Sequence, residues 1–579
     1  MGLGFGSCSG PGTDWQLKSP GLLWYHQKMC AAAFESPVER LRHWAKTTPD
    51  TIYLTQPIED QTITYSWSAV WDEVSRVASY LQRYPAGSHI AIISLNCAHW
   101  IMADLAIQMA GHISVPIYPT ASAATIEKIL QHSESKAVFL GKMFAPQVAR
   151  SLLPKDLDHL AIYQPQLGMP YWDQLVSEQP VIAEPVQNQP NDLVSIVYTS
   201  GTTGEPKGVM VSYRAVNAAM SLVKSIIDVN AADRFVSYLP LAHVAERMAV
   251  EFGALYNGSH VSFIRSLETF TDDIKAARPT IFFGVPRIWT KIKTAIEGKL
   301  GGAKVLGILL RLPLLGSVLK RALVKKLGFQ DVRYALCAAA AINQDVLVWY
   351  ENLGLKLNEA YGMSETCGLS HMVKPSQSCT GSVGQVIAGC ECKLADDGEV
   401  LLRNPAMMDG YYKQPELTVA TIDAAGWLHT GDLGVINDDG YLFITGRVKD
   451  IFKTSKGKYV APSPIEQRWQ SVLDMEHVIL MGNGFAQPFL VVSTHETEHA
   501  SNPNALIKSC QEALKTINST LEMQERISHV FISNTPWDPD NGLLTPTLKM
   551  KRASLEQHYE QAAAALMQSK QEAVLHIEA

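Results

Sequence analysis

Long apolar runs are missing from this sequence. No uninterrupted apolar stretch of about 18 residues occurs, so no membrane-spanning helix is predicted. The first residues lack a basic region followed by an apolar one, so no signal peptide is expected. An excess of basic residues is missing too. The chain has 49 Lys and Arg against 56 Asp and Glu, a formal net charge of −7, which argues against a nucleic-acid-binding protein.

Cysteine pairs are also missing. The nine cysteines are scattered and contain no Cys-x-x-Cys pair. Cys390 and Cys392 lie two positions apart, which in a strand places both on one face. Isolated buried thiols are therefore expected in place of a disulfide framework or a metal site, and the compartment is expected to be reducing. These absences predict a cytoplasmic protein, with peripheral contact at the inner face of the membrane as the alternative.

The length of 579 residues exceeds what one hydrophobic core supports, so several domains are expected. Residues 1–33 are rich in Gly, Ser and Pro without a period, which is typical of a disordered extension. Ser36, Pro37 and Glu39 then form a helix start with a capping box. A protein that begins at Met29 is therefore expected to fold and work normally.

Strands alternate with helices from Gly87 onward, which is typical of a parallel sheet covered on both faces. Helices are predicted over residues 98–109 and 124–132. Beyond Gly381, short β-type runs are separated by turn signals at residues 396–398 and 438–440. Strands are predicted over residues 89–95, 113–118, 136–140, 193–198, 234–240, 280–284, 331–341 and 356–360.

The predicted fold class is α/β. A large N-terminal domain over residues 34–446 is expected to hold parallel and mixed sheets covered by helices, plus a β-rich subdomain. A small, mobile α+β C-terminal domain is expected over residues 447–579, with the hinge near Lys449.

A loop rich in glycine and hydroxyl side chains, residues 198–208, lies between two apolar runs, and Ser212 could cap the helix that follows. Its glycines let backbone N–H groups face an anion, and Lys207 can supply a positive charge. The loop is no Walker A motif, because Pro206 precedes Lys207 and Gly208 follows it. A loop that closes over a nucleotide polyphosphate is one interpretation, and a flexible linker is the other.

Five further pieces carry chemistry that a nucleotide site needs. Tyr361 can stack on a base, and Glu365 can hold Mg²⁺. The carboxylate of Asp432 suits two vicinal ribose hydroxyls. The remaining pieces are Arg447, Lys549 and His243. Each alone is equally well interpreted as a core aromatic, a turn residue or a solvated charge.

Taken in order, residues 199–208, 361–365, 430–432 and 446–450 with Lys549 resemble the AMP-forming acyl-CoA synthetases, relatives of firefly luciferase and of peptide-synthetase adenylation domains. The resemblance runs from about Ser36 to Leu555. Within the family, residues 239–246, 285–292 and 541–552 resemble the long-chain fatty acyl branch.

The resemblance implies roles for these residues. Thr199 and Glu365 would lie near Mg²⁺, and with Lys549 they are the implied catalytic residues. Lys549 would reach the α-phosphate and the acyl carboxylate. Lys449 would be the hinge, and His243 and Gly457 would lie near the acyl group and CoA. The residues implied to contact ATP or AMP are Thr199, Ser200, Gly201, Thr202, Thr203, Gly204, Lys207, Ala339, Ala340, Tyr361, Gly362, Ser364, Asp432, Arg447 and Lys549.

The implied activity is that of a long-chain or medium-chain fatty acid–CoA ligase. It would use ATP with Mg²⁺ to form acyl-AMP and pyrophosphate, and then transfer the acyl group to coenzyme A. Two alternatives are a fatty acyl-AMP ligase that delivers acyl groups to a carrier protein, and a nucleotide-binding regulator without catalysis. The expected partners are fatty acid, ATP and CoA, with no nucleic acid; a homodimer is also considered.

Two positions depart from the family pattern. Residues 338–341 are all alanine where a Gly-Ala-Ala-Pro or Gly-Gly-Ala-Pro run is usual, which affects the expected adenine wall. Ala245 stands where long-chain members often carry an aromatic residue, which reshapes the expected acyl pocket.

Residues 304–326 are leucine-rich, carry six basic side chains and are interrupted by Pro313. An amphipathic pattern of this kind is typical of surface helices that pack on a sheet, and also of helices that make weak contact with a membrane.

Overall fold

The structure, a computed structural model, begins its description at Phe34. It describes residues 34–143, 153–154, 157–163, 168–200, 206–300, 302–312, 315–377, 379–473, 475–494, 503–539, 541–545, 549–569 and 573–577. The predicted extension over residues 1–33 therefore lies outside the described residues. The first helix, α2 (Pro37–Thr47), begins with the predicted capping box, in which Ser36 and Glu39 bond each other's backbone N–H groups.

A seven-stranded sheet forms the core of the N-terminal part, in the order β18-β8-β7-β4-β3-β5-β6. From β7 to β6 the strands are parallel, as predicted, and β8 and β18 are added antiparallel, so the sheet is mixed. Its strands are β3 (His89–Ile93), β4 (Ile113–Ile117), β5 (Ala137–Leu140), β6 (Asp158–Ala161), β7 (Leu193–Ser200), β8 (Pro206–Ser212) and β18 (Gly410–Tyr411).

Helices cover both faces of this sheet, because successive side chains of a strand point to opposite faces. Ile90 and Ile92 pack in one cluster with α3 (Trp67–Leu81) and α4 (Ala98–Met109), whereas Ala91 and Ile93 pack in another with α5 (Ala123–Ser133). Further helices of this part are α7 (Trp172–Glu178), α8 (Tyr213–Lys224), α9 (Val244–Glu246), the π-helix η1 (Arg247–Phe252), α10 (Gly253–Asn257) and α16 (Pro415–Thr421).

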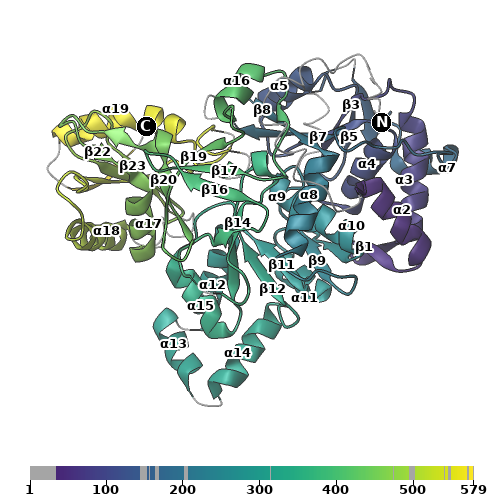
Figure 1. Cartoon of the computed structure of the whole chain (residues 1–579). Coiled ribbons are helices and arrows are strands. Elements are labelled where there is room, and N and C mark those ends of the chain that lie inside the picture. Colours follow the sequence, from purple (N-terminus) through teal and green to yellow (C-terminus); the bar gives the residue numbers. More distant parts are fainter. Residues whose placement is uncertain are drawn as a thin grey trace.

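Three smaller sheets surround this core (Figure 1). One has the order β2-β1-β10-β9, from Gln61–Ser66, Ile52–Ile58, His260–Phe263 and Arg234–Ser237. The second has the order β11-β12-β13-β14-β15, from Ile281–Gly284, Tyr334–Cys337, Leu357–Tyr361, His371–Met372 and Gln385–Val386. The third is antiparallel, β16-β17-β19-β20, from Glu391–Leu394, Glu399–Arg403, Leu428–Ile436 and Leu442–Arg447.

Helices beside the second sheet are α11 (Phe270–Ala277), α12 (Pro286–Lys299), α13 (Ala303–Arg311), α14 (Leu315–Lys326) and α15 (Gln344–Leu353). The predicted strand over residues 331–341 is shorter in the structure, where only Tyr334–Cys337 is extended. It stops because Ala339 takes a left-handed conformation, with φ of 77°.

The strands that flank the predicted phosphate loop differ from the prediction. β7 continues through Ser200 and β8 begins at Pro206, so the segment joins an antiparallel hairpin in which Thr199 pairs with Lys207. The strand was predicted to end at Tyr198, because glycine and threonine carry a strong loop signal. Ser212 stands at the N-cap of α8 as expected, but its side chain makes no capping bond there.

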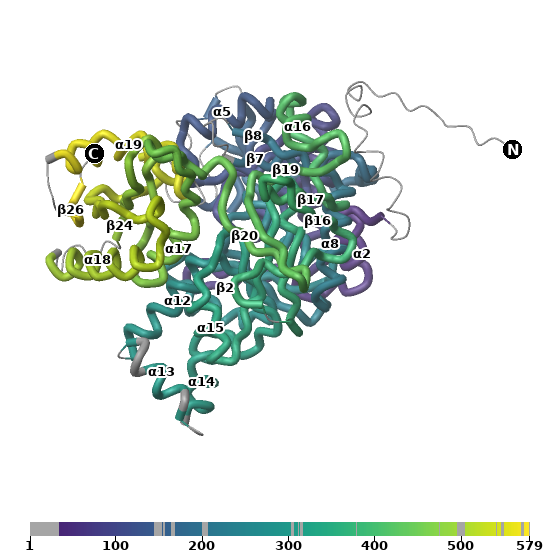
Figure 2. The backbone as a smooth tube through the Cα atoms, turned by 60° about the vertical axis from the view of Figure 1, so that its left-hand side comes forward, coloured from purple at the N-terminus to yellow at the C-terminus, as the bar shows by residue number. Residues whose placement is uncertain are grey.

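The C-terminal part has its own sheet and its own apolar clusters, as an α+β fold requires. The sheet has the order β23-β24-β25-β26, from His477–Met481, Phe489–Ser493, Val530–Ser533 and Val574–Ile577. The small hairpin β21 (Phe452–Lys453) and β22 (Tyr459–Val460) precedes it, and its helices are α17 (Pro462–Val472), α18 (Pro503–Asn518) and α19 (Arg552–Ser569). Both views show this part at one side of the large one (Figure 2). The domain boundary at 446/447 stays a prediction.

Candidate functional site

Three predicted site residues from three strands meet. Tyr361 ends β13, Asp432 lies in β19, and Arg447 ends β20 directly opposite Asp432 in the antiparallel register. The Tyr361 hydroxyl donates to Oδ2 of Asp432 at 2.6 Å, and Nε of Arg447 lies 3.0 Å from Oδ1. Asp432 is only 7% exposed, so its carboxylate is held by a donor on each side.

The electrostatics keep this group in one protonation state. Burial, and then the charge of Asp432, raise the pKa of the Tyr361 phenol far above its ordinary value. The phenol therefore remains a hydrogen-bond donor at any physiological pH. The Arg447 side chain is 60% exposed and can turn toward a ligand while its backbone stays in the strand.

After Tyr361 the backbone at Gly362 passes close to the backbone at Gly368. A methyl group on Gly362 would lie 2.2 Å from the carbonyl carbon of Gly368, so only glycine fits there. The short 3₁₀ helix η2 (Ser364–Thr366) follows, with Ser364 half-buried and Glu365 buried. This turn directs Glu365 back toward the hairpin of β7 and β8.

Glu365 is fixed by a residue that the sequence analysis missed. The Tyr411 hydroxyl donates to Oε1 of Glu365 at 2.7 Å, and the backbone N–H of Met408 donates to the Glu365 carbonyl at 2.8 Å. Nζ of Lys207 lies 5.7 Å from the centre of the Tyr411 ring, and Thr199 is the strand partner of Lys207. Tyr411 therefore lies between Glu365 and Lys207, the strand partner of Thr199.

The tip of that hairpin is outside the described residues. This applies to Gly201, Thr202, Thr203 and Gly204, and to the side chain of Ser200.

The alanine run lies beside the Tyr361 strand. β12 and β13 are parallel neighbours, so Ala339 and Ala340 follow β12 at the same sheet edge at which Tyr361 ends β13. The run of four alanines that departs from the family pattern has a cost at Ala339. This residue has a left-handed φ of 77°, which is unfavourable for a residue with a Cβ.

Lys549 reaches this group from the C-terminal part. Its ammonium lies within electrostatic range of Arg447, Asp432 and His243. Protein atoms that displace water lower its pKa most, Arg447 lowers it further, and Asp432 opposes the shift. Lys549 nevertheless keeps an exposed surface. Thr545 holds the backbone of Lys549 by one hydrogen bond in each direction.

His243, in the large part, also lies within electrostatic range of Lys549. It caps α9, where Nδ1 accepts from the backbone N–H of Ala245 at 3.1 Å. Burial, and then the charge of Lys549, lower its pKa to about 4, so the ring is neutral at neutral pH. Three residues after His243, the Glu246 carboxylate accepts from the Ser237 hydroxyl and from the Tyr238 N–H, which fixes the turn.

The predicted hinge is tied to the lysine turn. Lys449 is exposed in the 3₁₀ helix η3 (Val448–Asp450). Arg552, three residues after Lys549, lies 3.6 Å from Asp450 and 2.5 Å from Glu466. Arg552 therefore connects the segment of the predicted hinge with the Lys549 turn, a link that sequence spacing alone could not reveal.

Besides the approach of Lys549 to Asp432 and Arg447, an ion pair joins the large part and the C-terminal part. Nη2 of Arg287, at the start of α12, lies 2.5 Å from Oε1 of Glu476, which directly precedes β23. Both side chains retain solvent exposure, at 48% and 24%.

Gly457, predicted to lie near the acyl group and CoA, belongs to the small hairpin at the start of the C-terminal part. It forms the exposed turn between β21 and β22 with φ of 77°, and it donates its N–H to Thr454 of the same turn.

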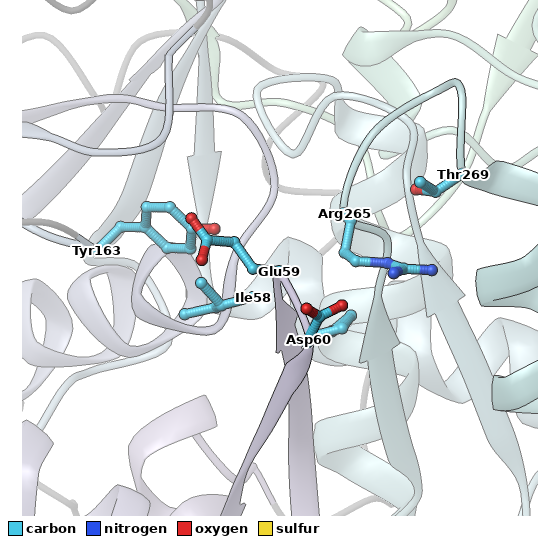
Figure 3. Close-up of a pocket in the computed structure, with 7 residues that line it drawn as sticks. Ile58, Glu59, Asp60, Tyr163, Arg265 and Thr269 are labelled. Carbon is cyan, nitrogen blue, oxygen red and sulfur yellow. The ribbon is translucent and has the colours of Figure 1, made fainter.

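A separate pocket lies at the β1–β2 turn, with a volume of about 420 Å³ (Figure 3). Glu59, Asp60, Tyr163 and Arg265 line it, and none of the predicted site residues does. Its acidic side chains make it unsuited to a triphosphate. Within the described part of the chain, no three His, Cys, Asp or Glu side chains are grouped to hold a metal.

Comparison with known proteins agrees with this geometry. A model of the AMP-binding enzyme family matches residues 41–412, and a model of the AMP-binding enzyme C-terminal domain matches residues 449–571. A putative fatty-acid–CoA ligase, fadD11 of Mycobacterium tuberculosis, is 30% identical over 416 residues, 64% of this chain and 73% of that protein. Long-chain-fatty-acid–CoA ligase 5 of Mus musculus is 27% identical over 588 residues, 88% of this chain and 85% of that protein.

The fold is shared with solved adenylate-forming structures. The adenylation domain of a carboxylate reductase from Mycobacterium chelonae superposes with a TM-score of 0.78 at 21% identity, covering 93% of this chain and 92% of that one. The anthranilate CoA ligase AuaEII in complex with anthranoyl-AMP gives 0.75 at 21% identity, covering 92% and 99%. The chain belongs to the AMP-binding enzyme family.

Proposed function

We propose that this protein is an AMP-forming fatty acid–CoA ligase. The observation that carries the proposal is the position of Lys549, which comes from the C-terminal part and faces Asp432, Arg447 and His243 of the large part. In the first half-reaction a fatty carboxylate oxygen attacks the α-phosphorus of ATP, and the bond to pyrophosphate breaks. In the second the CoA thiolate attacks the acyl carbon, and AMP leaves.

The roles of the residues follow from their chemistry. The Asp432 carboxylate accepts from the ribose hydroxyls, with Tyr361 and Arg447 orienting it. Lys549 neutralises charge between the carboxylate and the α-phosphate, where a fixed cation acts most strongly in a water-poor crevice. The N–H groups and hydroxyls of residues 199–204, with Lys207, bind the outer phosphates. No protein nucleophile is needed.

Magnesium fits the donors available. Glu365 and Thr199 offer oxygen ligands, and Mg²⁺ is usually held by one or two such groups together with waters and substrate phosphates. Tyr411 occupies one oxygen of Glu365, which leaves the other for a metal. When bound, Mg²⁺ would neutralise phosphate charge.

The substrate is proposed to be a medium-chain or long-chain fatty acid. The supporting observation is that relatives are named long-chain-fatty-acid–CoA ligases. Each buried CH₂ group contributes about 0.8 kcal/mol, so kcat/KM is expected to climb over several carbons. A flat or falling kcat/KM from acetate to dodecanoate would contradict this assignment.

Two alternatives are separated by product analysis. A fatty acyl-AMP ligase would release pyrophosphate with fatty acids but would make no acyl-CoA from free CoA, because its acceptor is a carrier protein. A regulator without catalysis would release no pyrophosphate. The presence of both Glu365 and Lys549 argues against such a regulator.

The proposal extends to the location of the protein and its partners. We place the protein in the cytoplasm, with weak peripheral contact to a membrane through residues 304–326, and we consider a homodimer. None of the described helices is long and apolar enough to cross a bilayer.

The deciding experiment measures acyl-CoA and pyrophosphate with carboxylates of graded length, with and without CoA. The proposal expects both products with dodecanoate or longer acids when CoA is present. Pyrophosphate without acyl-CoA would favour the carrier-protein alternative, and the absence of both products across the series would overturn the ligase assignment.

A further inference from the structure

The segment between Glu297 and Asp331 has an unusual charge. It contains seven Lys and Arg and no Asp or Glu, although the chain as a whole has 56 acidic residues against 49 basic ones. A positive segment on a negative protein binds most readily to a negative partner.

This segment forms a helical hairpin of α13 and α14. In both views the hairpin extends away from the rest of the molecule at its lower end (Figures 1 and 2). Gly316 allows the two helices to meet closely, since a methyl group there would lie 2.4 Å from the carbonyl oxygen of Leu310.

The hairpin is apolar on the side that faces the protein. Leu306, Leu310 and Leu323 are buried in a cluster with Trp289 and Phe329. The interpretation as surface helices packed on the body is therefore correct for this side. That packing holds the hairpin in place and fixes which residues point outward.

The outward side combines apolar and basic residues. Ile308 and Val318 are each 64% exposed, although both are large aliphatic side chains. Val318, Arg321 and Lys325 are all exposed and follow one another at helical spacing, so they share one face of α14. Among the described residues, Lys320, Arg321, Lys325 and Lys326 enter no ion pair.

We infer that the α13–α14 hairpin docks on the surface of an anionic phospholipid bilayer, with Ile308 and Val318 entering the interface and the basic residues facing lipid phosphates. Exposed aliphatic side chains beside Lys and Arg on one helix face are the pattern of interfacial helices. The inference narrows the membrane contact of the proposed function from residues 304–326 to Ile308, Val318 and the basic residues of α14, adds the requirement for anionic lipid, and rests on that part of the proposed function. Vesicle binding needs no ligase activity, so the two can fail separately.

The test is co-sedimentation of the full chain with vesicles of phosphatidylcholine plus phosphatidylglycerol, and with vesicles of phosphatidylcholine alone. The wild type is expected to bind the mixed vesicles at low salt, to lose binding as salt rises, and to bind the neutral vesicles poorly. Each basic residue near the surface strengthens binding about fivefold, so a variant with Lys320, Arg321, Lys325 and Lys326 all changed to Glu should bind at least about tenfold more weakly.

A matched control separates the hairpin from net charge. Lys46, Lys224, Lys508 and Lys515 are exposed lysines elsewhere, and changing all four to Glu alters the net charge equally. This control should retain most of the binding. Ile308→Ser with Val318→Ser should weaken binding several-fold without any change in charge.

Three outcomes would overturn the inference: equal binding by the wild type and the hairpin variant, an equal loss in the control, or equal binding to neutral vesicles. Acyl-CoA synthesis from a soluble acid without vesicles should be unchanged in every variant, which shows that each is folded. If the hairpin instead serves an acidic protein, the wild type will not sediment with either vesicle.

Discussion

The two sides of the candidate crevice are built differently. On the large side, Asp432 is buried between Tyr361 and Arg447, and Glu365 is buried against Tyr411. On the small side, Lys549 is held by Thr545 within its own turn and meets Asp432 and Arg447 only through space. One side is pre-organised, and the other must be brought to it.

The difference suggests how one crevice serves two reactions. A fixed nucleoside site can hold adenylate throughout, whereas the lysine is needed only while charge crowds at the α-phosphate. Because Arg552 ties the Lys549 turn to Asp450 beside the hinge, a rotation at Lys449 would withdraw Lys549 as a rigid unit.

Lys549→Ala should reduce acyl-AMP formation by about 10²–10³, the usual cost of removing one charge-stabilising group from an active site. Pyrophosphate release with a fatty acid measures this step. Lys551→Ala is the matched control, because Lys551 lies two positions on. If Lys551→Ala proves to be the inactive variant, the assignment of Lys549 is wrong.

Glu365→Gln should reduce adenylation by about 10², because one carboxylate charge is lost where Mg²⁺ is proposed to bind. Tyr411→Phe removes only the hydroxyl that donates to Glu365, and should cost about tenfold or less. Both losses should shrink as Mg²⁺ is raised. Losses that are independent of Mg²⁺ would contradict the metal role of Glu365.

Lys449→Pro should slow transfer to CoA about tenfold more than it slows acyl-AMP formation, because proline fixes φ at the proposed hinge. Each half-reaction is followed separately by quenched flow. Lys453→Pro, in the neighbouring hairpin, serves as a comparison for general backbone damage. Equal slowing of both steps by Lys449→Pro would place the hinge elsewhere.

Adenylation should decline at alkaline pH earlier than an ordinary lysine would allow. The pKa of Lys549 is lowered by its surroundings and by Arg447, and the charged form is the active one, so activity is lost as pH rises through that lowered pKa. Lys549→Arg should shift this decline to higher pH. An unchanged alkaline limb in that variant would show that another group causes it.

Arg287→Glu should slow adenylation about two- to fivefold, because an exposed ion pair contributes little and this one joins the two parts of the chain. Glu476→Arg should have the same effect, and the double exchange should restore the rate. Transfer from acyl-AMP to CoA should be spared. Without rescue in the double variant, the pair has no role in closure.

Local signals in the sequence gave much of the fold. The helix predicted over residues 98–109 has those bounds in the structure, and the capping box at Ser36 forms as predicted. The parallel strands were found because apolar runs alternated with helices. The β7–β8 hairpin was missed because glycine and threonine outweighed the strand signal that continues to Ser200.

The candidate site was predictable where the side chain itself indicates a function, as the carboxylates of Asp432 and Glu365 do. It was not predictable where a residue acts through a distant partner. Tyr411 lies 46 positions from Glu365, and Arg552 lies 86 positions from Glu466, so no local pattern connects them. Gly457 was assigned through the family resemblance alone, and its role stays a prediction.

In the proposed mechanism Lys549 serves one half-reaction, whereas the nucleoside site serves both. This division is tested by supplying synthetic acyl-AMP and CoA to Lys549→Ala and following acyl-CoA formation. The variant should retain most of the wild-type rate in this step while its adenylation is nearly lost. A loss of the second step as large as that of the first would contradict this division.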